Sequence, residues 1–241
     1  MKQRILMKFI QCSFLILVFA TPTRAGKFTT GLGYLYPEKY RRDNEINPLP
    51  FGLSVVPMIA YRGERFSLLG PRMSYRLVKG VVGLNLNVNI AGDRYKANIL
   101  DQRDTAIHGG FSLLLPFISL RYEQDLSSTH NGNLVRAQLR LPLPLSQNFF
   151  LRTSFGVEFV GEEFSDYYYR VDYHEVGLFS YYNPGKERNL LFNLNATYTL
   201  TPSTALSLNW SHKRFGREIA NSPTIRLKNF NTIGLFWNYT I

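Results

Sequence analysis

Cysteine is almost absent from this chain of 241 residues, and its single cysteine, Cys12, lies among the first 25 residues. Residues 26–241 therefore cannot form a disulfide, and they offer no thiolate ligand for zinc. No two histidines lie within a few residues of each other, and no glycine-rich phosphate loop or EF-hand spacing is present. These absences lead us to expect neither a bound metal nor a cofactor.

Long hydrophobic runs are also scarce. The only one is at the start of the chain, where Lys2, Arg4 and Lys8 precede an apolar segment at residues 9–20. That segment is shorter than the roughly 20 residues that a membrane-spanning helix needs. A basic start, a short apolar segment and small residues before Gly26 predict a secretory signal peptide over residues 1–25, cleaved after Ala25 or, alternatively, after Ala20.

Charged residues are scattered, although the formal net charge is +11. No run of five like charges occurs, which argues against nucleic acid as a partner. Anionic headgroups of outer-membrane lipids are a more natural partner for such a chain. We see no linker or low-complexity tract, so residues 26–241 are expected to form one domain.

Alternation of apolar and polar residues is the dominant pattern. Near the end of the chain, Ile233, Leu235, Trp237 and Tyr239 alternate with polar or small residues, and only Phe236 breaks the pattern. Successive side chains of a strand point to opposite faces. Repeated behind an export signal and accompanied by 15 Tyr and 18 Phe, this pattern predicts an all-β fold: a single antiparallel transmembrane β-barrel in the outer membrane of a Gram-negative bacterium.

The pattern predicts eleven strands, whereas a bacterial barrel needs an even number. We expect twelve, with ten as the alternative. The apolar phase switches at Gly70-Pro71, which we interpret as a bulge within one strand at 65–78. A further strand is expected within the long loop at 161–188. The predicted strands are 27–36, 51–62, 65–78, 81–92, 105–115, 117–126, 133–142, 147–160, 189–200, 203–213 and 229–241.

Polar residues on the inward face predict a charged lumen. Arginine and glutamate there can pair and fill the interior, which we favour, or can line a weakly anion-selective channel. The candidate lumen charges are Arg72, Arg76, Arg121, Arg136, Arg140, Arg152, Glu123 and Glu158.

A tyrosine cluster in the long loop is the most unusual local feature. It predicts either an interface girdle or self-packed loop, or an exposed platform for a partner or a glycan. The candidate contact residues are Asp166, Tyr167, Tyr168, Tyr169, Tyr173, Tyr181 and Tyr182.

Catalytic motifs are not apparent, so we predict a protein that is not an enzyme. Asp172 and His174 have the spacing of an Asp-x-His pair, but the second pair of acids that a barrel protease of that kind requires is missing. Ser211 and His212 are adjacent on a predicted strand, so their side chains point to opposite faces and cannot form a nucleophile–base pair.

Several motifs, in order along the chain, resemble the MipA/OmpV family of outer-membrane proteins. They are Pro48-Leu49-Pro50, Tyr61-Arg62-Gly63, Asp101 with Asp104, Asp166-Tyr167-Tyr168-Tyr169, Val171, Glu175, Gly177-Leu178, Tyr182-Asn183-Pro184 and Ser222-Pro223. The resemblance implies an outer-membrane barrel acting as a scaffold that joins a lytic transglycosylase to a penicillin-binding protein during peptidoglycan growth. A narrow porin-like channel or envelope-permeability protein is the alternative.

Overall fold

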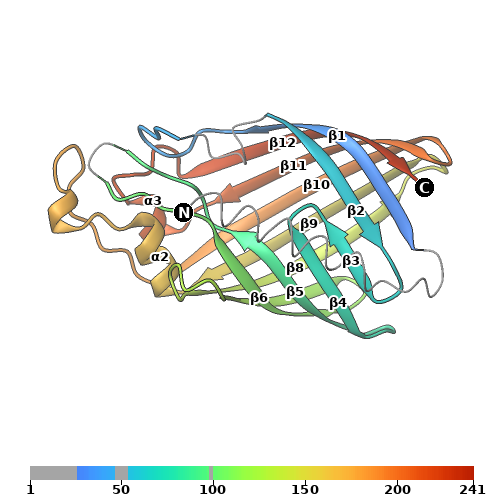
Figure 1. Cartoon of the computed structure of the whole chain (residues 1–241), viewed down its shortest axis with the longest axis horizontal. Helices are drawn as coiled ribbons and strands as arrows, with labels where there is room; N and C mark the ends of the chain where they lie inside the picture. The colour runs from blue at the N-terminus through green and yellow to red at the C-terminus, as the bar shows by residue number, and fades with distance from the viewer. Residues whose placement is uncertain (1–25, 47–53, 98–99) are drawn as a thin grey trace, which may run out of the picture.

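Twelve antiparallel strands close into one barrel in which β1 pairs with β12 (Figure 1). The computed structural model describes residues 26–46, 54–97 and 100–241. The predicted signal peptide, with Cys12, and the Pro48-Leu49-Pro50 motif lie outside these residues. The strands are β1 Lys27–Pro37, β2 Val55–Arg62, β3 Phe66–Leu69, β4 Arg72–Val78, β5 Gly83–Ala91, β6 Ala106–Leu114, β7 Ile118–Asp125, β8 Asn133–Pro144, β9 Phe149–Val160, β10 Glu187–Thr201, β11 Thr204–Arg214 and β12 Asn229–Thr240.

The alternation seen in the sequence becomes the two faces of the barrel wall. In β12, Leu235 and Trp237 are exposed, whereas Gly234 and Asn238 are buried. An apolar exterior and a polar interior are the arrangement that a barrel needs in lipid, because every backbone group pairs within the wall and only apolar side chains meet the acyl chains. The predicted fold class is confirmed.

Phe236, which breaks the alternation, lies on the inward face of β12. A Cβ atom on Gly33 would come within 2.2 Å of its ring, and one on Gly234 within 2.7 Å. Gly33 pairs directly with Phe236 across the β1–β12 ladder. The two glycines therefore leave the space that the inward phenylalanine occupies.

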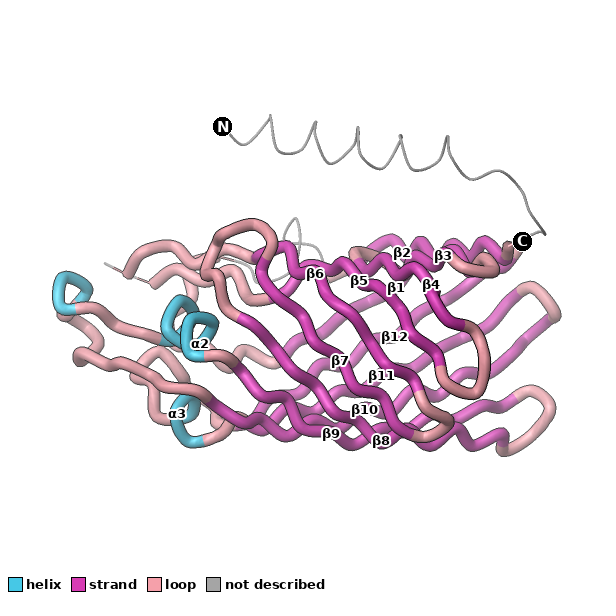
Figure 2. Tube along the Cα trace, turned by 90° about the horizontal axis from the view of Figure 1, so that it is seen from below, coloured by secondary structure: helices cyan, strands magenta, loops and turns pink. Residues whose placement is uncertain are grey.

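Short turns lie at one end of the barrel and long loops at the other (Figure 2). The first residue of β1 and the last of β12 lie at the short-turn end, which faces the periplasm in bacterial barrels. The loop end carries the helices α2 Glu162–Tyr169 and α3 Arg217–Ala220, with a 3-10 turn at Tyr173–Glu175. No helix among the described residues is long and apolar enough to cross a membrane.

The predicted number of strands is confirmed, but the route to it is wrong in two respects. Residues 65–78 form two strands, β3 and β4, rather than one strand with a bulge, because Gly70 adopts a φ of +53° and turns the chain. Residues 161–186 contain α2 and the 3-10 turn but no strand. The phase switch at Gly70-Pro71 thus marks a hairpin. Residues that face the lumen have odd numbers in β3 and even numbers in β4.

Candidate functional site

An ionic network lies inside the lumen, along strands β7, β8, β9 and β11. Arg136 on β8 donates to both carboxylates, from Nη1 to Glu123 Oε2 at 2.8 Å and from Nε to Glu158 Oε2 at 2.6 Å. Lys213 on β11 lies 2.6 Å from the other Glu158 oxygen. The two carboxylate side chains are only 2 % exposed. Because charges so deeply buried are stable only when paired, the four residues form a fixed ionic cluster inside the barrel.

Amide side chains complete the network. Asn89 on β5 donates to Glu123 at 2.8 Å, and Asn189 on β10 donates to Glu158 at 3.1 Å. Arg121 Nη1 lies 3.7 Å from Glu123 Oε1. These contacts use further acceptor positions of the two carboxylates. The predicted residues Arg121, Arg136, Glu123 and Glu158 are thus brought together in one cluster.

The other predicted lumen charges are not paired with acids. Arg140 donates to the backbone oxygen of Leu115 at 3.1 Å, and Arg152 lies 5.5 Å from the ring centre of Phe150. Arg72 and Arg76 point inward from β4. Among the described residues, Arg72, Arg76, Arg140 and Arg152 form no ion pair. The interior therefore carries an excess of positive charge.

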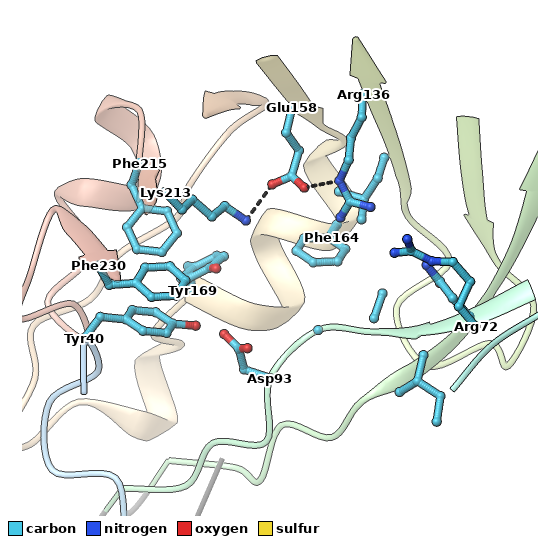
Figure 3. A pocket seen from close by; sticks show the side chains of 15 residues that line it. Tyr40, Arg72, Asp93, Arg136, Glu158, Phe164, Tyr169, Lys213, Phe215 and Phe230 are labelled. Atoms are coloured by element: carbon cyan, nitrogen blue, oxygen red, sulfur yellow. Dashed lines mark hydrogen bonds and ion pairs between the residues drawn. The ribbon is translucent and has the colours of Figure 1, made fainter. Parts of the chain in front are cut away.

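The mouth of the barrel is closed from within by α2. Phe164, Tyr168 and Tyr169 on this helix are buried and pack against residues of the neighbouring loops, including Phe215 and Ile225. Figure 3 shows Phe164 and Tyr169 beside the ionic network. Because aromatic side chains fill the mouth of the barrel, α2 acts as a plug that lies across it.

Arg41 holds the plug in place. Its guanidinium lies between the rings of Tyr95 and Tyr169, at 4.6 and 4.3 Å from their centres. It donates to the Tyr168 backbone oxygen at 2.8 Å and to Thr224 Oγ1 at 3.2 Å. Burial lowers the pKa of this arginine, and the nearby rings counteract that effect. One side chain thereby joins four loop-end segments.

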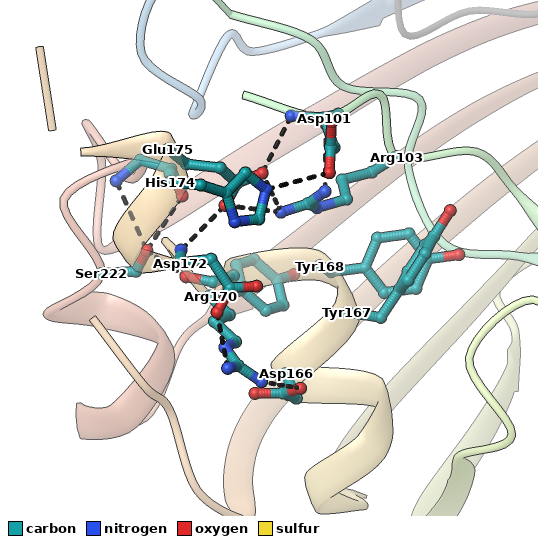
Figure 4. A network of polar contacts seen from close by, with 12 residues as sticks. Asp101, Arg103, Asp166, Tyr167, Tyr168, Arg170, Asp172, His174, Glu175 and Ser222 are labelled. Carbon is teal, nitrogen blue, oxygen red and sulfur yellow. Dashed lines mark hydrogen bonds and ion pairs between the residues drawn. The ribbon is translucent and has the colours of Figure 1, made fainter. Parts of the chain in front are cut away.

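The tyrosine cluster is divided between the interior and the surface. Figure 4 shows two of its members, Tyr167 and Tyr168, beside the polar contacts of the long loop. Tyr168 and Tyr169 are buried, so they offer no contact surface. Tyr167 accepts a hydrogen bond from the Asp104 backbone at 3.0 Å, and Tyr182 donates to the Glu218 backbone oxygen at 2.6 Å. The remaining predicted residues lie further out: Tyr173 and Tyr181 are exposed and stack at 4.1 Å, and Asp166 pairs with Arg170 at 3.1 Å.

Asp101, His174 and Glu175 each place a potential ligand atom within 4.8 Å of the others, close enough to share a metal ion. Glu175 is fully buried, and its carboxylate already accepts hydrogen bonds from Arg103 at 2.8 and 3.1 Å. The backbone N–H groups of Asp101 and Asp172 also donate to it, at 2.8 and 2.9 Å. A carboxylate so fully used organises the loop and leaves no free ligand position.

Two residues of the site were missed in the sequence. Lys213 continues the polar face of Ser207, Asn209 and Ser211, so the alternation of β11 could have identified it. Arg41 lies in a loop, where no periodicity applies. Only the folded arrangement of distant tyrosines reveals its role.

Comparison with known proteins identifies one family. The sequence profile described as MltA-interacting protein MipA matches residues 30–241. Comparison with curated proteins found no match.

Solved structures that the chain matches include outer-membrane proteins and channels, at TM-scores below 0.4. OprD from Pseudomonas aeruginosa is 13 % identical with a TM-score of 0.38, covering 90 % of this chain and 66 % of that one. This chain thus spans just under two thirds of the length of OprD. The NanC porin is 10 % identical with a TM-score of 0.39, covering 88 % and 98 %. The COG4313 outer membrane channel from Pseudomonas putida F1 is 10 % identical with a TM-score of 0.39, covering 90 % and 96 %.

Proposed function

This outer-membrane barrel protein belongs to the MipA family of MltA-interacting proteins, and from that membership we propose that it is a non-enzymatic scaffold for peptidoglycan enzymes. In this proposal the barrel anchors a lytic transglycosylase, and through it a penicillin-binding protein, at the inner surface of the outer membrane. The family description supplies the first partner. The second rests on the resemblance noted in the sequence.

The filled lumen is the observation that best supports a scaffold over a pore. Glu123, Arg136, Glu158 and Lys213 occupy part of the interior, and α2 lies across the mouth. A pore must leave a continuous wet path, whereas these groups are held by short ionic contacts and buried aromatic rings. A barrel with a closed interior acts through contacts on its outer surfaces.

The short-turn end is the surface on which we place the enzyme contact, because peptidoglycan lies in the periplasm and this end faces it. Three turns there expose large apolar side chains: Val81 is 79 % exposed, Phe117 56 % and Leu145 58 %. Exposed apolar side chains gathered at one end are typical of interaction sites. Tyr173 and Tyr181 lie at the opposite end and serve no periplasmic partner in this proposal.

Affinity capture tests the scaffold. The full barrel in detergent, immobilised through a tag, is incubated with a purified lytic transglycosylase. We expect specific retention, reduced about tenfold by the double variant Val81→Ser and Leu145→Ser, since a central apolar contact contributes about 1–2 kcal/mol. Tyr173→Ser, an equally exposed change at the loop end, should retain the enzyme. No retention by an intact wild-type barrel would contradict the proposal.

A narrow anion pathway is the second candidate, and one observation favours it. Arg76, Arg140 and Arg152 lie in the lumen without acidic partners among the described residues. Such a lining attracts anions and repels cations. Anion-selective conductance that falls on changing Arg140 and Arg152 to Gln would favour this function over a closed barrel.

A further inference from the structure

The barrel wall is incomplete beside the β3–β4 hairpin. β3 has only 4 residues, and its ladder with β2 covers Ala60, Tyr61 and Arg62. On the other side, β4 pairs with β5 no further toward the loop end than Val88. The hairpin therefore ends partway up the wall, while β2 and β5 continue beyond it.

Two strand edges remain open above the hairpin. Among the described residues, positions 55–58 of β2 have ladder partners only on β1, and positions 89–91 of β5 only on β6. Three strand spacings, each about 4.8 Å, separate β2 from β5 in a regular sheet. A Cβ atom on Gly70 at the hairpin tip would have no atom within 4 Å. We call this opening between residues 55–58 and 89–91 the notch.

Open edges at membrane depth are unusual. Backbone N–H and C=O groups facing hydrocarbon are costly unless protein or water satisfies them, which is why membrane barrels close their sheets. The notch lies in a wall whose flanks are apolar and exposed, including Val55 on β2 and Ile90 on β5. The notch is therefore surrounded by lipid, and a polar group is needed to form hydrogen bonds with the unpaired backbone groups along its two edges.

A cavity of about 140 Å³ lies directly behind the notch. Arg72, the first residue of β4, and Asn89, Ile90 and Ala91 of β5 border the notch and also line this cavity. Its inner wall is formed by the ionic network (Figure 3). One opening in the barrel wall and one polar cavity thus share the same residues.

Arg72 is the cation of this cavity that forms no ion pair among the described residues. Arg136 and Lys213 are both paired with Glu158, and the other acid, Asp93, lies 4.0 Å from Arg41. The Arg72 side chain points toward the cavity in Figure 3, and its buried Nε has no hydrogen-bond partner among the described residues. An unpaired guanidinium in a poorly hydrated site favours a phosphate or carboxylate, which can accept two of its hydrogen bonds.

We propose that the notch admits the anionic headgroup of a membrane lipid to Arg72. The phosphate group of the lipid occupies the cavity and accepts hydrogen bonds from the guanidinium. Its acyl chains remain in the bilayer against the apolar flanks at Val55 and Ile90. This lipid site is separate from the short-turn surface and does not depend on the scaffold role.

Native mass spectrometry of the full barrel tests the site with phosphatidylglycerol and phosphatidylcholine as probes. Wild-type protein should retain one phosphatidylglycerol at least tenfold more strongly than phosphatidylcholine. Arg72→Gln should abolish this preference. Arg152→Gln removes the same charge near the short-turn end of the lumen and should preserve it. Heat-modifiable migration in gels establishes that each variant is folded.

Two further measurements identify whether the bound anion is a lipid and whether it enters through the notch. Inorganic phosphate or glycerol phosphate at millimolar concentration should not displace the lipid; displacement would mean that the site takes a soluble anion. Because residues 26–241 contain no cysteine, Ile90→Cys can be blocked with a bulky maleimide. That block should lower lipid retention, whereas the same block at Leu208→Cys, on the lipid face of β11, should not. Equal retention by wild type and Arg72→Gln overturns the proposal.

Discussion

The Nε2 atoms of His108 and His130 lie 2.9 Å apart at the loop end of the barrel. The Gly132 backbone N–H donates to His130 Nδ1 at 2.8 Å, so this nitrogen is an acceptor. His130 must then carry its proton on Nε2 and donate it to His108, whose own proton lies on Nδ1. The pair is therefore formed by two neutral imidazoles, one donating to the other.

Acid should loosen the plug through His130. Burial lowers the pKa of His130 to about 4, despite the nearby carboxylate of Asp125. A histidine with a lowered pKa binds more protons when unfolded, so its contribution to stability is complete above about pH 6.5 and is lost as the pH falls toward 4. The loss approaches about 3 kcal/mol over this range. The ring lies 4.9 Å from Phe164, so α2 should respond first.

Hydrogen exchange of residues 162–169 at pH 7 and pH 5, corrected for the intrinsic exchange rate, measures this effect. Protection should fall at pH 5 in the wild type. The pH dependence should be much weaker in His130→Gln. His174→Gln, an exposed histidine at the same end, should behave as the wild type. An undiminished pH dependence in His130→Gln would show that another group is responsible.

Removing one carboxylate should destabilise the barrel through the cations left behind. Glu158→Gln leaves Arg136 and Lys213 without their shared partner in a buried site. We expect the free energy of unfolding to fall by about 3–5 kcal/mol. Urea titration in lipid vesicles, followed by tryptophan fluorescence, measures the change.

The matched control for this change is Glu64→Gln. Glu64 pairs with Lys79 at 3.1 Å, but both side chains are about half exposed or more. An exposed pair contributes less than about 1 kcal/mol, so this variant should unfold nearly as the wild type does. Equal effects of the two substitutions would contradict the buried network.

Arg41→Ala should release the plug while leaving the barrel wall intact. The substitution removes the contacts with the Tyr95 and Tyr169 rings and the hydrogen bond to Tyr168, a loss of about 2 kcal/mol. Limited proteolysis in vesicles should cleave the loop-end segments faster in this variant. Lys39→Ala, an exposed change in the same loop, should leave the cleavage rate unchanged. Identical rates in both variants would exclude Arg41 as the clamp.

Much of the fold could be predicted from the sequence, because lipid imposes a strict two-residue alternation. The strand near residues 229–241 and the inward position of Glu158 follow directly from that pattern. The hairpin at Gly70-Pro71 could not be separated from a bulge, since both reverse the phase of the alternation. Its short arms also violate the expectation that each strand spans the membrane.

The position of α2 across the mouth could not be predicted from the periodicity of the sequence. Two turns of helix at residues 162–169 are too short to show an amphipathic pattern clearly. The sequence alone leaves open whether Tyr168 and Tyr169 pack within the loop or form exposed contacts, because their burial depends on Arg41, more than 100 positions away in the chain. Contacts at such separation leave no local trace in one sequence.

Conductance of the purified full-length barrel in planar lipid bilayers tests the central claim, a closed interior, most directly. Among the described residues, Glu123, Arg136, Glu158 and Lys213 occupy the lumen and α2 lies across its mouth. The wild-type protein should insert without a steady current, and Glu158→Gln should produce brief openings. Reproducible, long-lived channels in the wild type would contradict a closed interior and would favour the anion pathway.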